Sequence, residues 1–103
     1  MVATGTGVPS LEGLRARRDE ILRIAALHGA RNVRVFGSVA VGYADAGSDI
    51  DLLVDLEPGR TVLDLSGLIL DLEEALGRKV DVLETPRRRT RVATQIRREA
   101  VPL

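Results

Sequence analysis

The sequence predicts a small α/β (α+β) domain in which helices pack against a mixed β-sheet. Three observations support this prediction. The 103 residues suit a single hydrophobic core. Segments in which apolar residues recur at helical spacing alternate with shorter segments typical of strands. Glycine or proline separates most of these segments. Helices packed on one sheet are the architecture that follows, although the pattern does not fix the strand directions.

Capping residues and breakers place the individual elements. Ser10 can cap a first helix, and Gly29 and Gly77 stand where left-handed residues would follow helices. The nearly continuous apolar run from Ile50 to Val54 is typical of a strand covered on both faces. The expected elements are a flexible leader (1–9) and a domain (10–103) made of a helix (10–28), a strand (31–36), a helical turn with a loop (39–48), a strand (49–55), a helix (61–76), a strand (79–83) and a helix (88–100).

The pattern also predicts which apolar residues face the core. In the first strand, Val33 and Val35 share one face because side chains alternate along a strand. In the helices, the expected core residues are Leu11, Leu14, Ile21, Leu22, Ala25, Val62, Leu65, Leu68, Ile69, Leu72, Leu76, Val92, Ile96 and Ala100.

The composition excludes several classes of function. The chain has no cysteine, which excludes disulfides and thiolate metal sites. Its 15 basic and 15 acidic residues balance, so no general attraction to nucleic acid or to an anionic membrane is expected. Phe36 and Tyr43 are the only aromatic residues, too few for a base-stacking surface. No signal peptide or membrane span is visible, which predicts a soluble cytoplasmic protein.

Three aspartates in strand-like segments are the strongest indication of chemistry. Asp49 and Asp51 should face the same way, roughly 6.5–7 Å apart along the strand. Asp81 lies between apolar residues of the last predicted strand. Aspartate is a poor strand former, and crowded carboxylates repel one another unless a cation lies between them. A hard divalent cation such as Mg²⁺ would relieve that repulsion, and a pair of ions could bridge a triphosphate.

Gly37-Ser38, ten residues before Asp49, is the candidate phosphate-binding segment. A glycine allows the backbone to approach a phosphate closely, and amides at the start of a helical turn can donate to its oxygens. Ser38 offers a further hydroxyl donor, although it could instead cap the following turn. Gly42 and Gly47 would allow the sharp return of the chain to Asp49.

These motifs resemble the nucleotidyltransferase superfamily that includes DNA polymerase beta and kanamycin nucleotidyltransferase. The segments VRVFGSVAVGYADAGSDIDLLVDL, DLEEALGRKVDVLE and IRREAVPL resemble, more narrowly, the minimal nucleotidyltransferase (MNT) family. This family contains the MntA-type antitoxins encoded beside HEPN-domain toxins. The resemblance extends from about residue 11 to the end of the chain. It implies the nucleotidyltransferase fold.

The resemblance also implies a reaction and a site. The family transfers AMP from ATP to a tyrosine of the partner HEPN toxin and so silences it. By this resemblance, Asp49 and Asp51 hold two Mg²⁺ ions, and Asp81 completes the catalytic metal site and helps to deprotonate the acceptor. Gly37 and Ser38 would bind the triphosphate. The chain departs from the family pattern at Val41, where the family often has arginine.

Other polar residues have a simpler interpretation. Asp55 and Asp45 are expected to be a solvated turn residue and a loop acid, and His28 a structural or solvent-facing residue. Tyr43 lies between the two halves of the motif, where it could pack near a nucleotide. The basic run Arg87–Arg91 is typical of a solvated helix start, although its charge opposes the helix dipole and could attract an anion.

Other functions remain open at this point. The chain could be a non-catalytic antitoxin that neutralises a toxin by binding it, or a nucleotidyltransferase that modifies a small molecule. The small size counts against the second alternative, because kanamycin-type enzymes are longer. An arginine-rich module that binds nucleic acid would show salt-sensitive binding that survives loss of the aspartates.

Overall fold

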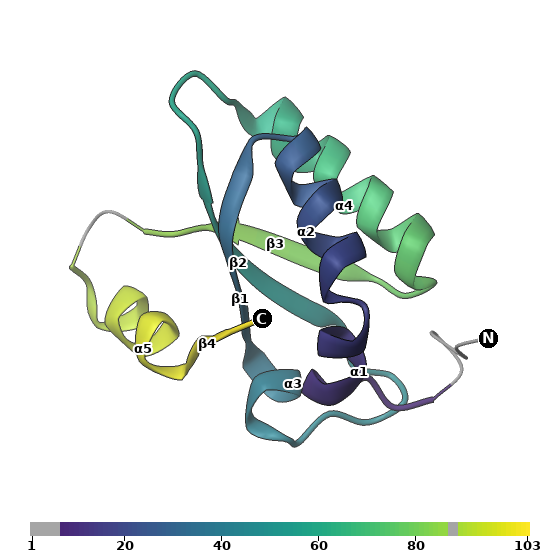
Figure 1. Ribbon diagram of the computed structural model, residues 1–103. Coiled ribbons are helices and arrows are strands. Elements are labelled where there is room, and N and C mark those ends of the chain that lie inside the picture. The colour runs from purple at the N-terminus through teal and green to yellow at the C-terminus, as the bar shows by residue number, and fades with distance from the viewer. Residues whose placement is uncertain (1–6, 87–88) are drawn as a thin grey trace.

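A computed structural model describes residues 7–86 and 89–103 of the chain. Within these residues, one four-stranded mixed sheet carries helices on both faces (Figure 1), which confirms the predicted fold class. In chain order the elements are α1 (Leu11–Ala16), α2 (Arg18–Leu27), β1 (Ala30–Phe36), α3 (Gly37–Val41), β2 (Ile50–Leu56), α4 (Val62–Leu76), β3 (Val80–Glu84), α5 (Arg91–Glu99) and β4 (Val101–Pro102).

The order of the strands in the sheet is β3-β2-β1-β4. β1 runs antiparallel to both of its neighbours, β2 and β4, whereas β2 and β3 are parallel. α4 makes the crossover between the two parallel strands, as a parallel connection requires. The sheet is therefore mixed, and its parallel pair is the pair that carries the predicted acidic residues.

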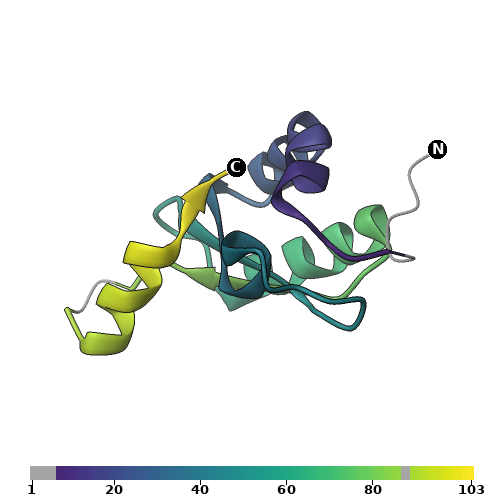
Figure 2. The ribbon, with the colours of Figure 1, turned by 90° about the horizontal axis from the view of Figure 1, so that it is seen from below.

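The main core lies between the sheet and the helices α2 and α4. Figures 1 and 2 show these two helices together on one side of the sheet and α5 apart from them. Val33 and Val35 are buried on that side, as predicted. The other buried residues of this core are Leu14, Ile21, Ala25, Ala30, Val39, Ile50, Leu52, Val54, Leu68, Leu72, Leu76, Val80, Val82 and Leu103.

The single helix expected at 10–28 is wrong, because the chain forms two helices that meet at Arg17. Ser10 caps α1 as predicted, with its hydroxyl accepting from the Gly13 amide at 2.9 Å. Arg17 leaves the helical conformation, and its guanidinium donates to the Ala75 carbonyl of α4 at 2.8 Å. Helical periodicity cannot predict this contact, because the two residues are 58 positions apart in the sequence.

The C-terminal segment also differs from the prediction. α5 begins at Arg91 and ends at Glu99, and residues 101–102 form a short strand that pairs with β1. Arg15 donates to the carbonyl oxygens of Pro102 and Leu103, at 2.7 and 3.3 Å. A strand of two residues is too short to show the alternation by which strands are predicted.

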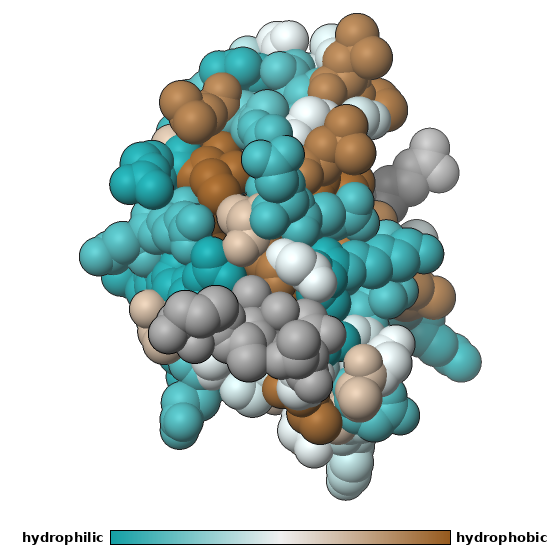
Figure 3. Space-filling model, turned by 90° about the vertical axis from the view of Figure 1, so that its right-hand side faces the viewer, coloured by the Kyte–Doolittle hydropathy of each residue, from teal (hydrophilic) through white to brown (hydrophobic). Residues whose placement is uncertain are grey.

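The predicted core positions Val62 and Val92 are wrong. Val62 is 75% exposed because it lies in the first turn of α4, before the buried stripe of that helix begins. Val92 is 69% exposed because α5 buries the neighbouring Ala93 in its place. Leu63 and Leu70 of α4 are likewise 82% and 66% exposed. Figure 3 views the side of the molecule that α2 and α4 cover, and it shows apolar residues exposed among hydrophilic ones, with several gathered in its upper half. Within residues 7–86 and 89–103, no helix is long and apolar enough to cross a membrane.

Candidate active site

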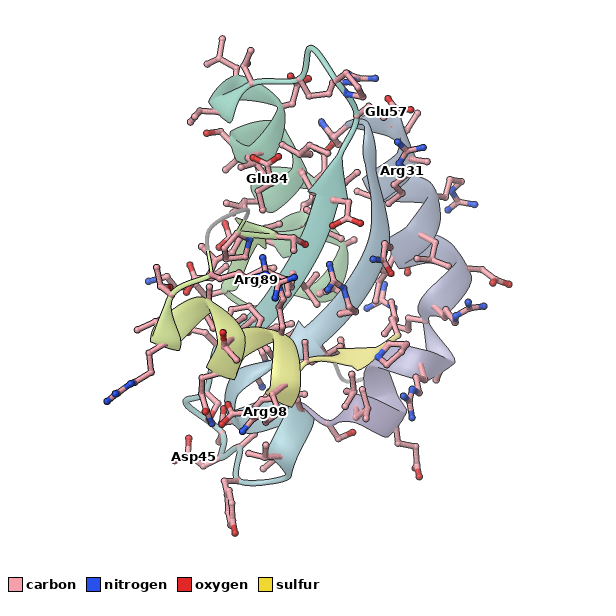
Figure 4. The ribbon with its side chains drawn as sticks, turned by 90° about the vertical axis from the view of Figure 1, so that its left-hand side faces the viewer. Arg31, Asp45, Glu57, Glu84, Arg89 and Arg98 are labelled. Atoms are coloured by element: carbon pink, nitrogen blue, oxygen red, sulfur yellow. The ribbon has the colours of Figure 1, made fainter. Side chains whose placement is uncertain are left out.

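The face of the sheet opposite the main core, which we call the outer face, carries the acidic residues. Strand alternation places Asp51, Leu53 and Asp55 of β2 on this face. The register pairs Asp51 with Phe36 of β1 and with Asp81 of β3. Figure 4 shows the outer face with α5 in front of it. Asp51 and Asp81 therefore lie side by side on adjacent parallel strands.

The predicted acids form one electrostatic group. Asp51 is half-buried and Asp81 exposed, and Asp49 directly precedes β2. Burial raises the pKa of Asp51, and the negative charges of Asp81 and Asp49 raise it further. Both neighbours are thus close enough to disfavour a charge on Asp51, and a cation at this position would reverse the effect.

Gly37 lies directly against the carboxylate of Asp51. It has φ +75°, a left-handed conformation that other residues adopt only with strain. A Cβ at Gly37 would lie 2.4 Å from Oδ2 of Asp51, closer than two unbonded atoms can be. Glycine is therefore required at position 37 for two reasons: the left-handed backbone conformation, and the lack of space for a Cβ beside the Asp51 carboxylate.

Ser38 is the second residue of α3, and Phe36 occupies the cap position. The alternative in which Ser38 caps this helical turn is therefore wrong. Among the hydrogen bonds of the described residues, none involves the Ser38 hydroxyl, whereas its carbonyl accepts from the amides of Gly42 and Tyr43. The hydroxyl thus has no structural task among these residues and remains available to a ligand.

Residues 42–48, which we call the motif loop, connect α3 to the acidic strand. Oδ1 of Asp45 accepts from the Gly47 amide at 2.9 Å, and the Ser48 hydroxyl accepts from the Asp45 amide at 2.9 Å. Asp45 is a loop acid as expected, and these bonds also give it a structural role. Tyr43 is 84% exposed, so it does not pack against the described part of the chain.

Val41, the departure from the family pattern, ends α3 with a half-exposed side chain. It lines a shallow, mostly apolar hollow of about 360 Å³ that contains none of the three predicted acids. The hollow also includes residues from the N-terminal side of α1. The residues that line it with Val41 are Val8, Pro9, Ser10, Leu11, Val39, Ala40, Gly42 and Ala44.

The expectation that Asp55 is a solvated turn residue is wrong. Asp55 lies within β2 on the outer face, where Thr85 donates to its Oδ1 at 2.6 Å and Asn32 to its Oδ2 at 3.0 Å. Arg34 also contacts Oδ1, at 3.1 Å. These partners come from β1 and from the residue after β3, so the carboxylate ties three strands together. The sequence showed only that Asp55 continues the alternation from Asp51.

The Asp55 network predicts a pH-dependent contribution to stability. The hydrogen bond from Thr85, then that from Asn32 and the charge of Arg34, lower the pKa of Asp55 below its ordinary value of 3.8. The stabilisation is therefore present above pH 3.8 and is lost as the pH falls through the lowered folded-state pKa. The unfolding temperatures of wild type and Asp55→Asn should differ most near neutral pH and become equal in acid.

The control for this prediction is Glu84→Gln, because Glu84 is an exposed acid of β3 whose side chain makes no hydrogen bond among the described residues (Figure 4). Its unfolding temperature should follow wild type at every pH. A difference between wild type and Asp55→Asn that stays constant down to pH 2 would contradict the ionic origin of the effect.

The donor set suits a magnesium ion. Within residues 7–86 and 89–103, no three acidic, histidine or cysteine side chains lie together as a group that could hold a metal ion, so the structure does not bring Asp49, Asp51 and Asp81 together as one set of ligands. The available oxygens come instead from the adjacent pair Asp51 and Asp81, with Asp49 next to them. Mg²⁺ is usually held by one or two carboxylates and completes its shell with water and substrate phosphates. An open pair of carboxylates therefore fits this ion better than a closed cage.

The remaining polar candidates have other positions. His28 pairs with Asp71 of α4 at 2.7 Å on the opposite side of the sheet, which agrees with a structural role. Of the basic run 87–91, residues 87 and 88 lie outside the described residues. Arg89 lies in front of the outer face in Figure 4, and Arg98 lies at the end of α5.

Comparisons with known proteins identify the family of the chain. The family model of the nucleotidyltransferase domain matches residues 18–101. A relative from Methanocaldococcus jannaschii, assigned by name as a protein adenylyltransferase, is 42% identical over 66 residues, covering 64% of this chain and 71% of the relative. The protein adenylyltransferase MntA of Thermococcus cleftensis is 37% identical over 73 residues, covering 71% of this chain and 74% of the relative.

Solved structures give the same result. One, assigned as a minimal nucleotidyltransferase, is 52% identical and superposes with a TM-score of 0.79 over 91% of this chain and 96% of that chain. A second solved structure, a toxin–antitoxin crystallised with AMP-PNP, has a TM-score of 0.69 at 21% identity and shows the shared fold. The match covers 82% of this chain and 69% of that chain. The family match, the relatives and the acidic pair lead to one conclusion: the chain belongs to the nucleotidyltransferase domain family and is a minimal nucleotidyltransferase.

Proposed function

We propose that the chain transfers AMP from ATP to a tyrosine of a partner HEPN-domain toxin, in a Mg²⁺-dependent reaction that makes it an antitoxin. The observation that carries the proposal is the pairing of Asp51 with Asp81 on parallel strands, directly beside Gly37. This arrangement supports the proposal because two neighbouring carboxylates, which are donors for a divalent cation, lie beside a glycine backbone.

Each predicted residue has a task in this reaction. Asp49 and Asp51 would hold the metal ions, of which we propose two, and Asp81 would complete the catalytic one. These ions would supply charge neutralisation at the triphosphate. The amides of Gly37 and Ser38, together with the Ser38 hydroxyl, would bind and orient the triphosphate oxygens.

The transfer itself balances without a further reactant. The tyrosine hydroxyl oxygen forms a bond to the α-phosphorus of ATP, and the bond from that phosphorus to the bridging oxygen breaks. Pyrophosphate leaves with that oxygen. Asp81, exposed at the outer face, accepts the tyrosine proton.

A protein partner is supported by two observations. One relative is named MntA, and one structure with the same fold is a toxin–antitoxin with AMP-PNP.

The test is intact-mass spectrometry of the neighbouring gene's helical protein after incubation with the chain, ATP and Mg²⁺. The expected result is a gain of one or more AMP units with wild type and none with the double variant Asp49→Ala/Asp51→Ala. Phenylalanine at the modified tyrosine of the toxin should remove the gain.

The alternatives give different results in the same experiment. If both versions form a tight complex and neither changes the mass, the chain acts as a binding antitoxin and the catalytic proposal fails for that partner. If only a small molecule such as an aminoglycoside gains AMP, the protein acceptor is wrong. Retention of the double variant on RNA in a salt-dependent manner would instead indicate a nucleic-acid-binding module.

A further inference from the structure

Arg78 lies between α4 and β3 and binds the motif loop from outside. Its Nη1 donates to the carbonyl oxygens of Ala46 and Ser48, at 3.0 and 3.1 Å. Its Nη2 contacts the carbonyl oxygen of Gly7. The guanidinium therefore fixes backbone atoms that are 30 and 32 residues away in sequence, including the residue directly before Asp49.

The contacts of Arg78 join the starts of the two strands that carry the acids. Next to it, the Lys79 carbonyl accepts from the Ile50 amide at 3.0 Å, so the chain before β3 is bonded to the first residue of β2. On the other side, Glu73 of α4 accepts from the Val80 amide at 3.1 Å. The motif loop and the start of β3 are thus held as one unit.

This connection bears directly on the acidic pair. Asp49 follows Ser48 without an intervening residue, and Asp81 lies three residues after Arg78. Asp51 pairs with Asp81 across the sheet and lies two residues after Asp49, so the separation of these carboxylates depends on how firmly the starts of β2 and β3 are held. Within the described residues, Arg78 is the side chain that bonds to the carbonyls of the motif loop from another element.

We propose that Arg78 is a positioning residue that sets the distance between Asp49 and Asp81 for metal binding. The inference rests on the proposed function, because it concerns the same metal site. Arg78 acts through the backbone of Ser48 and touches no substrate. Residues that orient metal ligands from outside typically contribute about 10- to 100-fold to metal affinity or activity.

Arg15 provides a matched control. It too donates to two backbone carbonyls distant in sequence, those of Pro102 and Leu103, but it does so at the C-terminal strand and away from the acids. Arg15→Met should therefore cost folding stability in the same manner as Arg78→Met. A lysine at position 78 keeps the positive charge and can still reach carbonyl oxygens, so Arg78→Lys should rescue part of the loss.

The experiment measures the affinity of the nucleotide-free chain for Mn²⁺, by the loss of the free-ion signal in electron paramagnetic resonance, at a temperature where all variants are folded. Arg78→Met is expected to bind Mn²⁺ about tenfold more weakly than wild type, Arg78→Lys less so, and Arg15→Met equally well. Amide hydrogen exchange of residues 45–50 should speed up in Arg78→Met alone.

Each outcome is decisive. Equal Mn²⁺ affinity in wild type, Arg78→Met and Arg15→Met, with Asp51→Asn binding none, overturns the positioning role and leaves the proposed function intact. If Asp51→Asn binds Mn²⁺ as well as wild type does, or wild type binds none, the proposed metal site is wrong and the positioning role falls with it. If Arg78→Met does not fold, the Mn²⁺ affinity of Arg78→Lys is compared with that of Arg15→Lys. Weaker binding by Arg78→Lys supports the positioning role, and equal binding overturns it.

Discussion

Asp51→Asn is expected to lower the rate of AMP transfer by about a thousandfold or more. Asp51 pairs with Asp81 across the sheet and also feels the charge of Asp49, so in the proposed site its carboxylate would hold a metal ion beside either neighbour. Loss of about 4 kcal/mol of transition-state stabilisation corresponds to roughly a thousandfold in rate. Single-turnover transfer to the toxin, followed by intact mass, measures this loss directly.

The same variant is expected to be more stable than wild type without metal. The pKa of Asp51 is raised in the folded state, so this residue favours folding at low pH and opposes it as the pH rises through that pKa. An uncharged asparagine escapes both the burial of a charge and the repulsion by its neighbours. Thermal unfolding at neutral pH should therefore show a higher midpoint for Asp51→Asn, and a lower midpoint would contradict the electrostatic account.

The second large effect is expected for Gly37→Ala. The new Cβ would lie 2.4 Å from Oδ2 of Asp51, and because an aspartate side chain is short, the carboxylate must turn away. The left-handed conformation adds about 1–2 kcal/mol of strain. We expect transfer to fall by about a hundredfold or more, together with a lower unfolding temperature.

Gly42→Ala separates these two causes. Gly42 has φ +84°, so alanine there is strained as at Gly37, but a Cβ would meet no atom within 4 Å. Gly42→Ala should lose stability by a similar strain while keeping most of its transfer rate. If the two alanine variants lose activity equally, then backbone strain, and not displacement of Asp51, explains the effect of Gly37→Ala.

The chemistry-bearing part of the fold was predictable because its signals are local. Gly37-Ser38 and Asp49-x-Asp51 lie within 15 residues, and strand alternation alone places Asp51 on one face. The pairing of Asp51 with Asp81 was different. It depends on β2 and β3 being parallel neighbours in register, which periodicity does not specify. The resemblance to the family implied only that Asp81 joins Asp49 and Asp51 at one site, and it left the strand pairing open.

The features that escaped prediction depend on contacts between residues far apart in sequence. Asp55 looked like a turn acid because Thr85 and Asn32, its partners, are 30 and 23 residues away. The break at Arg17 depends on a carbonyl 58 residues later. Val62 fitted the helical stripe by spacing, but it is the first residue of α4 and is 75% exposed, whereas the buried residues of this helix begin at Leu68.

The position of β3 at the edge of the sheet has a consequence for the size of the acceptor. Among the described residues, β3 pairs with β2 alone, so no further strand lies along its other edge, beside the exposed Asp81. An enclosed pocket would admit a metabolite and exclude a folded domain, whereas an open edge allows a protein surface to approach. In the proposed reaction, the docked acceptor protein would itself cover this edge and help to keep water from the bound ATP.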